Sequence, residues 1–323
     1  MTVEMRQCIA CGNAVEYKEL VVKEMMFGTN DQFTYIECTI CGCLQLKEIP
    51  KEISKYYPDN YYSFKEQKSL FVKTFFVTLR DRHYVGTKNL IGSLLNKRFP
   101  APLYLKVFKF INAQFDWKIL DVGSGAGEKL LALRNIGFKK IMGIDPNIEK
   151  GISYKNGLQI KKMSLTEVDD KYDLILFNHS LEHMENPVSV LKEAKRKMND
   201  EALIVLRIPV AGCYAMEKYG VFWDGLDAPR HLFIPTKKSL RFLADRCGLE
   251  IISEFCDSTS MQFWASEQYQ KGISLMDPRS FSINPKNSIF TRNQIKNFTI
   301  EAERLNAEGK GDIICLVLKE KLT

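Results

Sequence analysis

The feature that most restricts the fold is an alternation of short apolar runs with helical stretches, which begins near residue 117. The runs are "KILDVG", "KIMGID", "LQIKKMS", "YDLILFN" and "ALIVLRI", followed by "LEIISEF" and "DIICLVLKE". Strands that alternate with helices form a parallel sheet with helices on both faces. Capping residues agree, because Asn186-Pro187 and Thr236 each precede a helical segment and Gly248 follows the second one. We therefore expect an α/β domain.

The first apolar run leads into a turn with three glycines, "ILDVGSGAGEK". Such turns serve several ligands, because a residue without a Cβ lets the backbone approach a bound molecule closely. A phosphate-binding P-loop needs Lys and then Ser or Thr after its last glycine, but Gly127 is followed by Glu128-Lys129-Leu130. A dinucleotide turn has the pattern G-x-G-x-x-G, and Glu128 stands where its third glycine would fall. The sequence therefore disfavours both ligands.

A second acid follows the next apolar run, where Asp145 ends "IMGID". A carboxylate at the end of that strand can accept hydrogen bonds from both hydroxyls of a ribose. Together with Asp121 in the glycine turn, this acid favours a ligand that contains a ribose.

Five of the nine cysteines lie in the first 43 residues. Cys8-x-x-Cys11-Gly and Cys38-x-x-Cys41-Gly are two knuckles that can each direct two thiolates at one ion, as in a zinc ribbon. Cys43 is a competing ligand, and the alternative to a metal site is a small hydrophobic lobe with reduced cysteines. Four protein ligands leave no open coordination position, so we expect a structural Zn²⁺ held by Cys8, Cys11, Cys38 and Cys41.

The segment 65–109 contains ten Lys or Arg residues and two acids, although the whole chain has a net charge of only +7. Its apolar residues recur at helical spacing, with basic residues between them. Such a segment is a solvated face over a core, a lid over an anionic substrate, or a contact with a membrane surface. The sequence alone does not separate these alternatives.

The composition, 45% hydrophobic and 26% charged, is that of an ordinary globular protein. The beginning, "MTVEMRQCIACGN", has no apolar core of signal-peptide type, so we expect a cytoplasmic protein, peripheral at the inner face of the membrane if the basic segment binds there. We expect three parts: a zinc-ribbon-like lobe and aromatic connector over 1–63, a basic helical segment or lid over 64–115, and the α/β domain over 116–323.

With these motifs in this order, residues 117–320 resemble a class I S-adenosylmethionine-dependent methyltransferase. The whole chain, with its zinc knuckles, resembles bacterial methyltransferases of sugars and surface polysaccharides. The resemblance implies a Rossmann-like fold with a seven-stranded, mostly parallel sheet and an antiparallel terminal strand. It also implies S-adenosylmethionine as the cofactor, beside the structural Zn²⁺ of the N-terminal lobe.

Several stretches carry this resemblance to the cofactor site: "LDVGSGAG" is similar to the family's first motif, "GIDPN" to its second and "YDLILFNHSLEHMENP" to its fourth. Where many members have an acid near the adenine, this chain has Met163-Ser164-Leu165, which leaves adenine recognition to Ser164 and the backbone. Glu182-His183 is implied at the mouth of the site. The cofactor contacts implied are Asp121, Gly123, Ser124, Gly125, Gly127, Asp145, Pro146, Ser164, Leu165, Asn178 and His179.

The acceptor is expected near "CYAMEKYGVFWDGLDAPRHLFIPTKKSL". Deoxysugar C-methyltransferases carry Tyr-His-Glu-His where this chain has Ala228-Pro229-Arg230-His231, so only the last histidine matches. We therefore favour O-methylation of a sugar hydroxyl over carbanion chemistry. The catalytic candidates are His231 as the base, Arg230 for a phosphate or carboxylate of the acceptor, and His179.

A structural alternative is that His231 caps a loop and Arg230 pairs with Asp227. The expected acceptor is a small molecule or glycan, such as a nucleotide- or lipid-linked sugar in polysaccharide or deoxysugar biosynthesis. We expect no nucleic-acid partner, because "NHSLEH" is not the N-P-P-Y type and no Pro-Cys nucleophile pair is present. The alternatives are an RNA (rRNA or tRNA) methyltransferase, a sugar C-methyltransferase, and a non-catalytic, S-adenosylmethionine-binding or membrane-associated protein.

Overall fold

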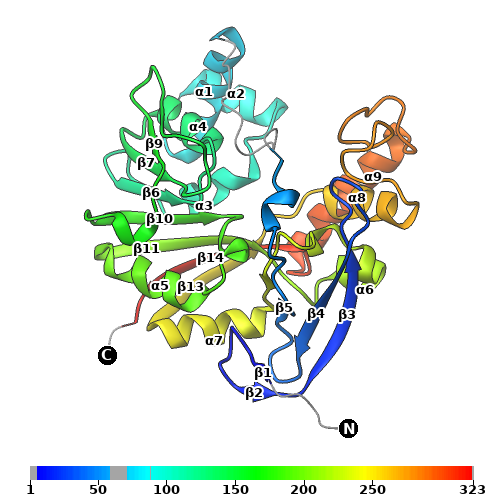
Figure 1. Ribbon diagram of the computed structural model, residues 1–323. Coiled ribbons are helices and arrows are strands. Elements are labelled where there is room, and N and C mark those ends of the chain that lie inside the picture. The colour runs from blue at the N-terminus through cyan, green and yellow to red at the C-terminus, as the bar shows by residue number, and fades with distance from the viewer. Residues whose placement is uncertain (1–5, 59–70, 88, 322–323) are drawn as a thin grey trace. The chain divides into compact units, whose positions relative to one another are not determined.

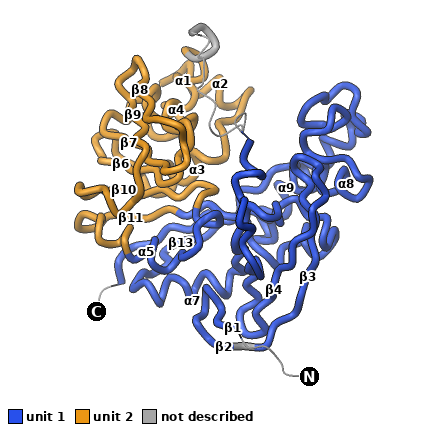
Figure 2. The backbone as a smooth tube through the Cα atoms, viewed as in Figure 1, with its two compact units in different colours: residues 1–58, 181–192, 206–323 blue, residues 59–180, 193–205 orange. Residues whose placement is uncertain are grey.

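The computed structural model describes residues 6–58, 71–87 and 89–321, which form two compact units (Figure 2). Unit 1 contains residues 1–58, 181–192 and 206–323, and unit 2 contains residues 59–180 and 193–205. The end of the aromatic connector and the first residues of the basic segment lie outside the described residues. The division into 1–63, 64–115 and 116–323 stays a prediction.

Unit 2 is built on parallel strands. Strand β6 (Lys118–Val122) pairs in parallel with β10 (Tyr172–Asn178) and with β7 (Lys140–Ile144), and β7 pairs in parallel with β9 (Gln159–Lys161). The strand β6 is buried along most of its length, which explains its continuous apolar run, because a parallel sheet is covered on both faces. A short strand, β8 (Ile152–Ser153), adds an antiparallel edge beside β9.

Along the chain, some helices of unit 2 precede the first strand of the sheet and others connect its strands (Figure 1). The helices α1 and α2 pack closely at Gly92, where an added Cβ would lie 2.4 Å from the carbonyl oxygen of Leu79. The expected helical character of the described part of the basic segment is confirmed. The helical elements are α1 (Phe71–Val85), α2 (Leu90–Arg98), η3 (Leu103–Leu105), α3 (Lys106–Phe110), α4 (Glu128–Ile136) and η4 (Leu165–Glu167).

Two elements continue the chain from one unit into the other, α5 (Pro187–Arg196) and β11 (Met198–Pro209). In unit 1, β13 (Leu249–Cys256) pairs antiparallel with β14 (Ile313–Glu320), which confirms the expected antiparallel terminal strand. Among the described residues, the strand order is β13-β14-β11-β10-β6-β7-β9-β8. The sheet is mostly parallel and Rossmann-like as expected, and β8 extends the expected seven strands to eight.

The N-terminal lobe of unit 1 contains a second sheet. Its order is β12-β5-β4-β3, and every pairing is antiparallel. The strand β12 (Phe233–Ile234) comes from far along the chain and pairs with β5 through Phe233 opposite Gln45. This pairing fixes the segment that contains His231 to the cysteine lobe. The lobe's own strands are β1 (Arg6–Gln7), β2 (Ala14–Val15), β3 (Tyr17–Lys23), β4 (Gln32–Cys38) and β5 (Leu44–Leu46).

The caps expected from the sequence are present in unit 1. The amide N–H of Ser189 donates to Asn186 at the start of α5. Thr236 caps α7 (Lys237–Cys247), and Gly248 ends that helix in the left-handed conformation. No helix within the described ranges is long and apolar enough to cross a membrane. The other helical elements are η1 (Ile53–Tyr56), η5 (Leu181–His183), α6 (Tyr214–Tyr219), η6 (Gly220–Phe222), η7 (Asp224–Leu226), α8 (Met261–Gln270) and α9 (Arg292–Ala307).

Candidate functional site

The glycine turn of unit 2 leaves β6 and leads into α4. Gly123, Gly125 and Gly127 have φ angles of 75°, 54° and 79°, in the left-handed region that favours glycine. The N–H of Gly123 donates to the carbonyl of Ile144 at 2.8 Å, which ties the turn to the end of β7. An added Cβ at Gly127 would lie 2.4 Å from Cδ1 of Ile160. The turn therefore needs glycine both for its conformation and for its packing.

Asp145 stands at the end of β7, as the sequence predicts, and supports the glycine turn. Its Oδ2 accepts from the N–H of Gly125 at 2.9 Å, and its Oδ1 accepts from the N–H of Asn147 at 2.8 Å. Burial raises the pKa of this carboxyl, although the two backbone donors oppose the shift. Each carboxylate oxygen has two lone pairs, so these bonds leave room for the two hydroxyls of a ribose.

Asp121 lies at the end of β6 and is almost completely buried. Its Oδ1 has no hydrogen-bond partner among the described residues. Burial raises the pKa of Asp121 to about 7, and the nearby Asp145 adds to the shift while Lys129 opposes it. An unpaired buried carboxyl oxygen is costly unless a ligand supplies a donor. Asp121 thus fits the amino group of a methionyl ligand.

Asn178 and His179 follow β10. Among the described residues, Oδ1 of Asn178 is a buried acceptor without a hydrogen-bond partner. His179 has a φ of 55°, an uncommon conformation for a residue with a side chain. The hydroxyl of Ser180 donates to the carbonyl of Val122 at 2.6 Å and holds this loop to the end of β6. Sequence reasoning missed Ser180, because a serine after a strand has no distinctive pattern.

The remaining predicted cofactor residues also lie in unit 2. Ser164 caps η4, where its hydroxyl donates to Oε2 of Glu167 at 2.7 Å, and Leu165 is buried. Pro146 is exposed directly after Asp145. The turn glycines, Asp145 and the unpaired oxygens of Asp121 and Asn178 fit S-adenosylmethionine, whose bound sulfonium supplies the methyl group. The role of each residue toward the cofactor stays a prediction.

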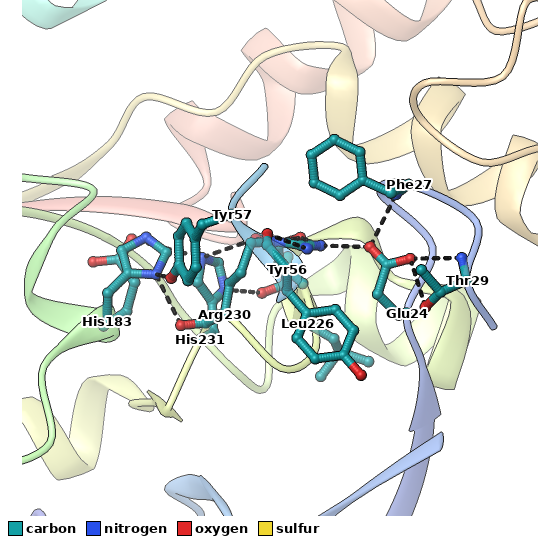
Figure 3. Close-up of polar contacts among 12 residues, drawn as sticks. Glu24, Phe27, Thr29, Tyr56, Tyr57, His183, Leu226, Arg230 and His231 are labelled. Carbon is teal, nitrogen blue, oxygen red and sulfur yellow. Dashed lines mark hydrogen bonds and ion pairs between the residues drawn. The ribbon is translucent and has the colours of Figure 1, made fainter. Parts of the chain in front are cut away.

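In unit 1, Arg230 is the centre of a buried ion-pair network (Figure 3). The side chain of Arg230 is completely buried, and its Nη2 donates to Oδ1 of Asp227 at 2.6 Å and to Oε1 of Glu24 at 3.0 Å. Its Nη1 donates to the carbonyl of Tyr56 at 3.3 Å. The pairing with Asp227 that the sequence left open is therefore present. The expected contact of Arg230 with an acceptor anion stays a prediction.

Glu24 is a member of this network that sequence reasoning missed. It is completely buried, and its carboxylate also accepts from the backbone N–H groups of Phe27 and Thr29, at 2.9 and 3.0 Å. The only local signal is one acid beside the apolar pair Met25-Met26. Its partner Asp227 has a left-handed φ of 36°. Burial opposes ionisation of Asp227, but the charge of Arg230, its hydrogen bonds and the two nearby imidazoles together outweigh the effect of burial, so the pKa of Asp227 is lowered.

His231 is buried beside this network. Its Nδ1 hydrogen-bonds to the carbonyl of Gly225 at 2.9 Å, and its own carbonyl accepts from the hydroxyl of Tyr35 at 2.6 Å. Its Nε2 lies 3.9 Å from Oε1 of Glu182 and 3.9 Å from Oδ2 of Asp227. Burial lowers the pKa of His231, so the ring is neutral near pH 7. With Nδ1 donating to a carbonyl, Nε2 carries a lone pair.

His183, from the predicted fourth motif, lies next to His231, with ring centroids 4.9 Å apart. Its Nδ1 hydrogen-bonds to the carbonyl of Arg230 at 2.8 Å, and the hydroxyl of Tyr57 lies 3.3 Å from the same nitrogen. Burial, with the neighbouring His231, lowers the pKa of His183 to about 4. The acceptor cluster, defined here as Glu182, His183, Asp227, Arg230 and His231, therefore combines two neutral imidazoles with carboxylates.

The predicted metal ligands come together at the end of the strand pair β3–β4 where Cys38 lies opposite Tyr17, whereas Glu24 follows the opposite end of β3. All four sulfurs of Cys8, Cys11, Cys38 and Cys41 lie within 4.8 Å of one another, with 3.6 Å between Cys8 and Cys41 and 3.8 Å between Cys11 and Cys38. Tetrahedral zinc with Zn–S bonds of ~2.3 Å separates its sulfurs by about 3.8 Å. The cluster therefore fits the predicted Zn²⁺, and Cys43 lies outside this group of four.

The two cysteine knuckles have the same backbone geometry. The N–H of Gly12 donates to the carbonyl of Cys8 at 2.8 Å, and the N–H of Gly42 donates to that of Cys38 at 2.7 Å. Both glycines have left-handed φ angles, 79° and 70°. The hydrogen bond between the thiols of Cys41 and Cys8 lowers the pKa of Cys8 and raises the pKa of Cys41.

Comparisons with known proteins found one curated relative and several solved structures that resemble this chain. A tRNA U34 carboxymethyltransferase from Campylobacter hominis is 28% identical over 99 residues, which are 28% of this chain and 35% of that protein, so the chain spans little more than a third of this relative. A methyltransferase from Archaeoglobus fulgidus, described as dependent on S-adenosylmethionine, matches in structure with a TM-score of 0.41 and 17% identity, over 71% of this chain and 99% of that one. A cyclopropane synthase from Mycobacterium tuberculosis matches with a TM-score of 0.40 and 12% identity, over 63% of this chain and 78% of that one.

A family model described as a methyltransferase domain matches residues 86–254, more than half of the chain. The match includes the glycine turn, Asp145, the fourth motif and His231. The chain therefore belongs to this family of methyltransferase domains.

Proposed function

We propose that this enzyme O-methylates a hydroxyl of a sugar, on a nucleotide-linked, lipid-linked or glycan acceptor of surface polysaccharide or deoxysugar biosynthesis. The observation that carries the proposal is the acceptor cluster: a neutral, buried His231 whose Nε2 faces two carboxylates at 3.9 Å. Methyl transfer from a sulfonium needs an aligned nucleophile, and a hydroxyl becomes a good nucleophile only as it loses its proton. The acceptor cluster supplies groups that can remove it.

The sequence pattern supports oxygen over carbon as the methylated atom. The positions that carry tyrosine and glutamate in deoxysugar C-methyltransferases are Ala228 and Arg230 here. The guanidinium of Arg230 is paired with Glu24 and Asp227. This position therefore provides no group that could accept the proton whose loss forms a carbanion. His231 is the one member of that pattern that this chain keeps.

The test is turnover of His231→Ala, measured as release of S-adenosylhomocysteine with a panel of nucleotide sugars and isolated glycans. We expect a loss of about 10²–10⁴-fold in turnover, typical of a lost proton acceptor, with unchanged affinity for S-adenosylmethionine. His83→Ala is the matched control, because His83 is a histidine of α1 in unit 2. Normal turnover of His231→Ala would remove this residue from the mechanism.

A second candidate function is methylation of RNA, favoured by the tRNA-modifying relative from Campylobacter hominis. The excess of basic residues in 65–109 is compatible with it. The same panel therefore includes total tRNA and rRNA. Turnover on RNA, with binding that weakens steeply with salt, would replace the sugar acceptor by a nucleic acid.

We also propose that the described part of the basic segment, residues 71–110, contacts an anionic membrane surface that carries a lipid-linked acceptor. Leu90 and Leu94 of α2 are 87% and 68% exposed, on the face opposite Gly92, which packs against α1. Among described residues 75–110, the only acid is Asp81, which is buried and paired with Arg80. The other exposed large apolar residues of the described part of this segment are Phe75, Phe76, Val77, Ile91, Phe99, Leu103 and Phe110.

The charge of this surface favours lipid over a second protein chain. Arg82, Lys97 and Arg98 are exposed, and the last two follow the apolar residues of α2 on the same helix. Apolar residues rimmed by cations bind anionic lipid surfaces. We expect the protein to sediment with vesicles of phosphatidylglycerol and phosphatidylcholine, and the variant Leu90→Ser/Leu94→Ser to stay in the supernatant. Dimerisation without vesicle binding would assign the surface to a second copy.

A further inference from the structure

Three members of the acceptor cluster form a second group of metal-type ligands, apart from the cysteines. Glu182, His183 and His231 each offer one ligand atom, and these atoms lie within 4.8 Å of one another. Oε1 of Glu182 and Nε2 of His231 are 3.9 Å apart. Two ligands bound to one ion at ~2.0–2.2 Å are separated by about 3–3.5 Å. These two atoms would therefore need to approach each other by about 0.4–0.9 Å to bind one ion.

Hydrogen bonds to backbone carbonyls hold both imidazoles in place. Nδ1 of His231 is hydrogen-bonded to the carbonyl of Gly225 at 2.9 Å, and Nδ1 of His183 to the carbonyl of Arg230 at 2.8 Å. A histidine that binds a metal commonly donates its other ring N–H to such a carbonyl, which fixes the tautomer and the ring. Both rings are thus fixed before any ligand arrives.

The buried ion pairs of Arg230 add rigidity to this arrangement. The carbonyl that holds His183 belongs to Arg230, whose guanidinium is bonded to Glu24 and Asp227. Glu182 is completely buried, and the N–H of Leu232, next to His231, donates to the carbonyl of Glu182 at 2.8 Å. The carboxylate and the imidazoles therefore come from two segments that are hydrogen-bonded to each other.

We propose that Glu182, His183 and His231 bind one divalent transition-metal ion, separate from the ion of the four cysteines. Two imidazoles and one carboxylate suit ions of the Zn²⁺, Fe²⁺ and Co²⁺ type better than Mg²⁺ or Ca²⁺, which prefer oxygen ligands alone. Three protein ligands leave at least one coordination position open, in contrast to the closed set of four cysteines.

The role that the open coordination position would have in catalysis rests on the proposed O-methylation, but the binding of the ion does not. A cation that takes the acceptor hydroxyl as a further ligand lowers the pKa of that hydroxyl. The proton of the hydroxyl would pass to solvent, and the oxygen would attack the methyl carbon as the carbon–sulfur bond breaks and its electron pair passes to sulfur. His231 is then a metal ligand, whereas without an ion it is itself the proton acceptor.

The test is titration of the zinc-loaded protein with Co²⁺, followed by calorimetry and visible absorption, without any acceptor. We expect the wild type to bind one further equivalent of Co²⁺, with weak bands of nitrogen and oxygen ligation and no thiolate charge-transfer band. Glu182→Gln and His231→Asn should each weaken binding by more than about tenfold. His83→Asn is the matched control and should bind Co²⁺ like the wild type.

No further equivalent of Co²⁺, or unchanged binding by Glu182→Gln, would overturn the proposal. X-ray absorption at the cobalt edge tests the wild type itself, in case the variants do not fold: sulfur neighbours would assign the ion to the cysteines and reject the site. Turnover of the acceptor panel with and without the second ion is measured separately. Ion binding without sugar turnover would reject only the acceptor class, and sugar turnover without ion binding would reject only the metal site.

Discussion

The cofactor turn in unit 2 and the acceptor cluster in unit 1 are assembled from the chain in different ways. The turn needs residues 121–127 and, from the next strand, Asp145, and its contacts are mostly with backbone groups. The cluster combines residues from η5 and from the segment 227–231, and its Arg230 forms an ion pair with Glu24 of the N-terminal lobe, 206 positions away in the sequence. The first region depends on local conformation, and the second on distant segments that hold one another in place.

Because the acceptor cluster depends on distant segments, the N-terminal lobe with its four cysteines also helps to hold the cluster in place. The hydroxyl of Thr236 donates to the carbonyl of Cys41 at 2.6 Å, and Arg246 donates to the carbonyls of Ile9 and Ala10 at 2.8 Å. The strand β12, which follows His231, pairs with β5 of the lobe. Zinc bound by the four cysteines would therefore order the same sheet that positions the segment with His231.

The largest expected effect is that of Cys38→Ser. Bound zinc contributes roughly 10–16 kcal/mol to folding in small zinc modules, so this variant should lose zinc and unfold the lobe. We expect turnover to disappear while S-adenosylmethionine still binds, because the glycine turn belongs to unit 2. Elemental analysis, thermal unfolding and calorimetry with the cofactor measure the three quantities.

The matched control is Cys43→Ser, which changes a buried cysteine of the same lobe outside the group of four. It should keep its zinc. If Cys38→Ser retains stoichiometric zinc and unchanged stability, the four cysteines are not the ligands.

The next effect concerns the buried ion pairs. Arg230→Met leaves the carboxylates of Glu24 and Asp227 buried without their cation, which should lower the free energy of unfolding of unit 1 by about 3–5 kcal/mol. Denaturant unfolding measures this change. Arg304→Met, which removes exposed ion pairs with Glu301 and Glu308, is the control and should change nothing measurable.

A double variant makes this prediction specific to the network. Adding Glu24→Gln to Arg230→Met removes one uncompensated charge, so the pair should be more stable than the sum of the two single effects predicts. Strict additivity would mean that Glu24 and Arg230 do not stabilise each other.

A smaller effect is expected in the cofactor turn, from Gly127→Ala. A left-handed φ costs a residue with a Cβ roughly 1–2 kcal/mol, and the added Cβ would also clash with Ile160. Gly212→Ala is the matched control, because Gly212 has a similar φ of 73° and no described atom within 4 Å of an added Cβ. We expect weaker S-adenosylmethionine binding in Gly127→Ala only, measured by calorimetry, and equal binding by both variants would show that the turn tolerates a Cβ.

The same difference explains which features the sequence could predict. The strands of the parallel sheet, the glycine turn, Asp145 and the cysteine knuckles follow from patterns within a few residues, because strand alternation and turn conformation are local. Glu24 and Tyr35 could not be assigned, since their partners Arg230 and His231 lie far along the chain and come close through non-local contacts such as the pairing of β5 with β12. The strand β8 was missed because two residues carry no periodicity.

The smallest expected effect is a pH dependence that belongs to the cofactor site alone. Burial raises the pKa of Asp121 to about 7, so near neutral pH much of this carboxyl is protonated in the free protein. Because the folded-state pKa is raised, the free protein loses stability as the pH rises through this value. A cationic methionyl group beside Asp121 favours the ionised form, so S-adenosylmethionine affinity should increase about tenfold as the pH rises through the pKa of Asp121.

Calorimetry in two buffers of different ionisation enthalpy should show release of a proton from the wild type at neutral pH, which Asp121→Asn should not show. The variant should also be more stable than the wild type in the absence of cofactor above the pKa of Asp121, because it buries no charge there. If wild type and Asp121→Asn release the same number of protons, the titrating group is the amino group of the ligand, and Asp121 is only a structural residue at the end of β6. Loss of the pH dependence in Asp121→Asn would show that Asp121 contacts the cofactor. The role of this cofactor residue, unlike that of the acceptor residues, can then be recognised from one short stretch of sequence.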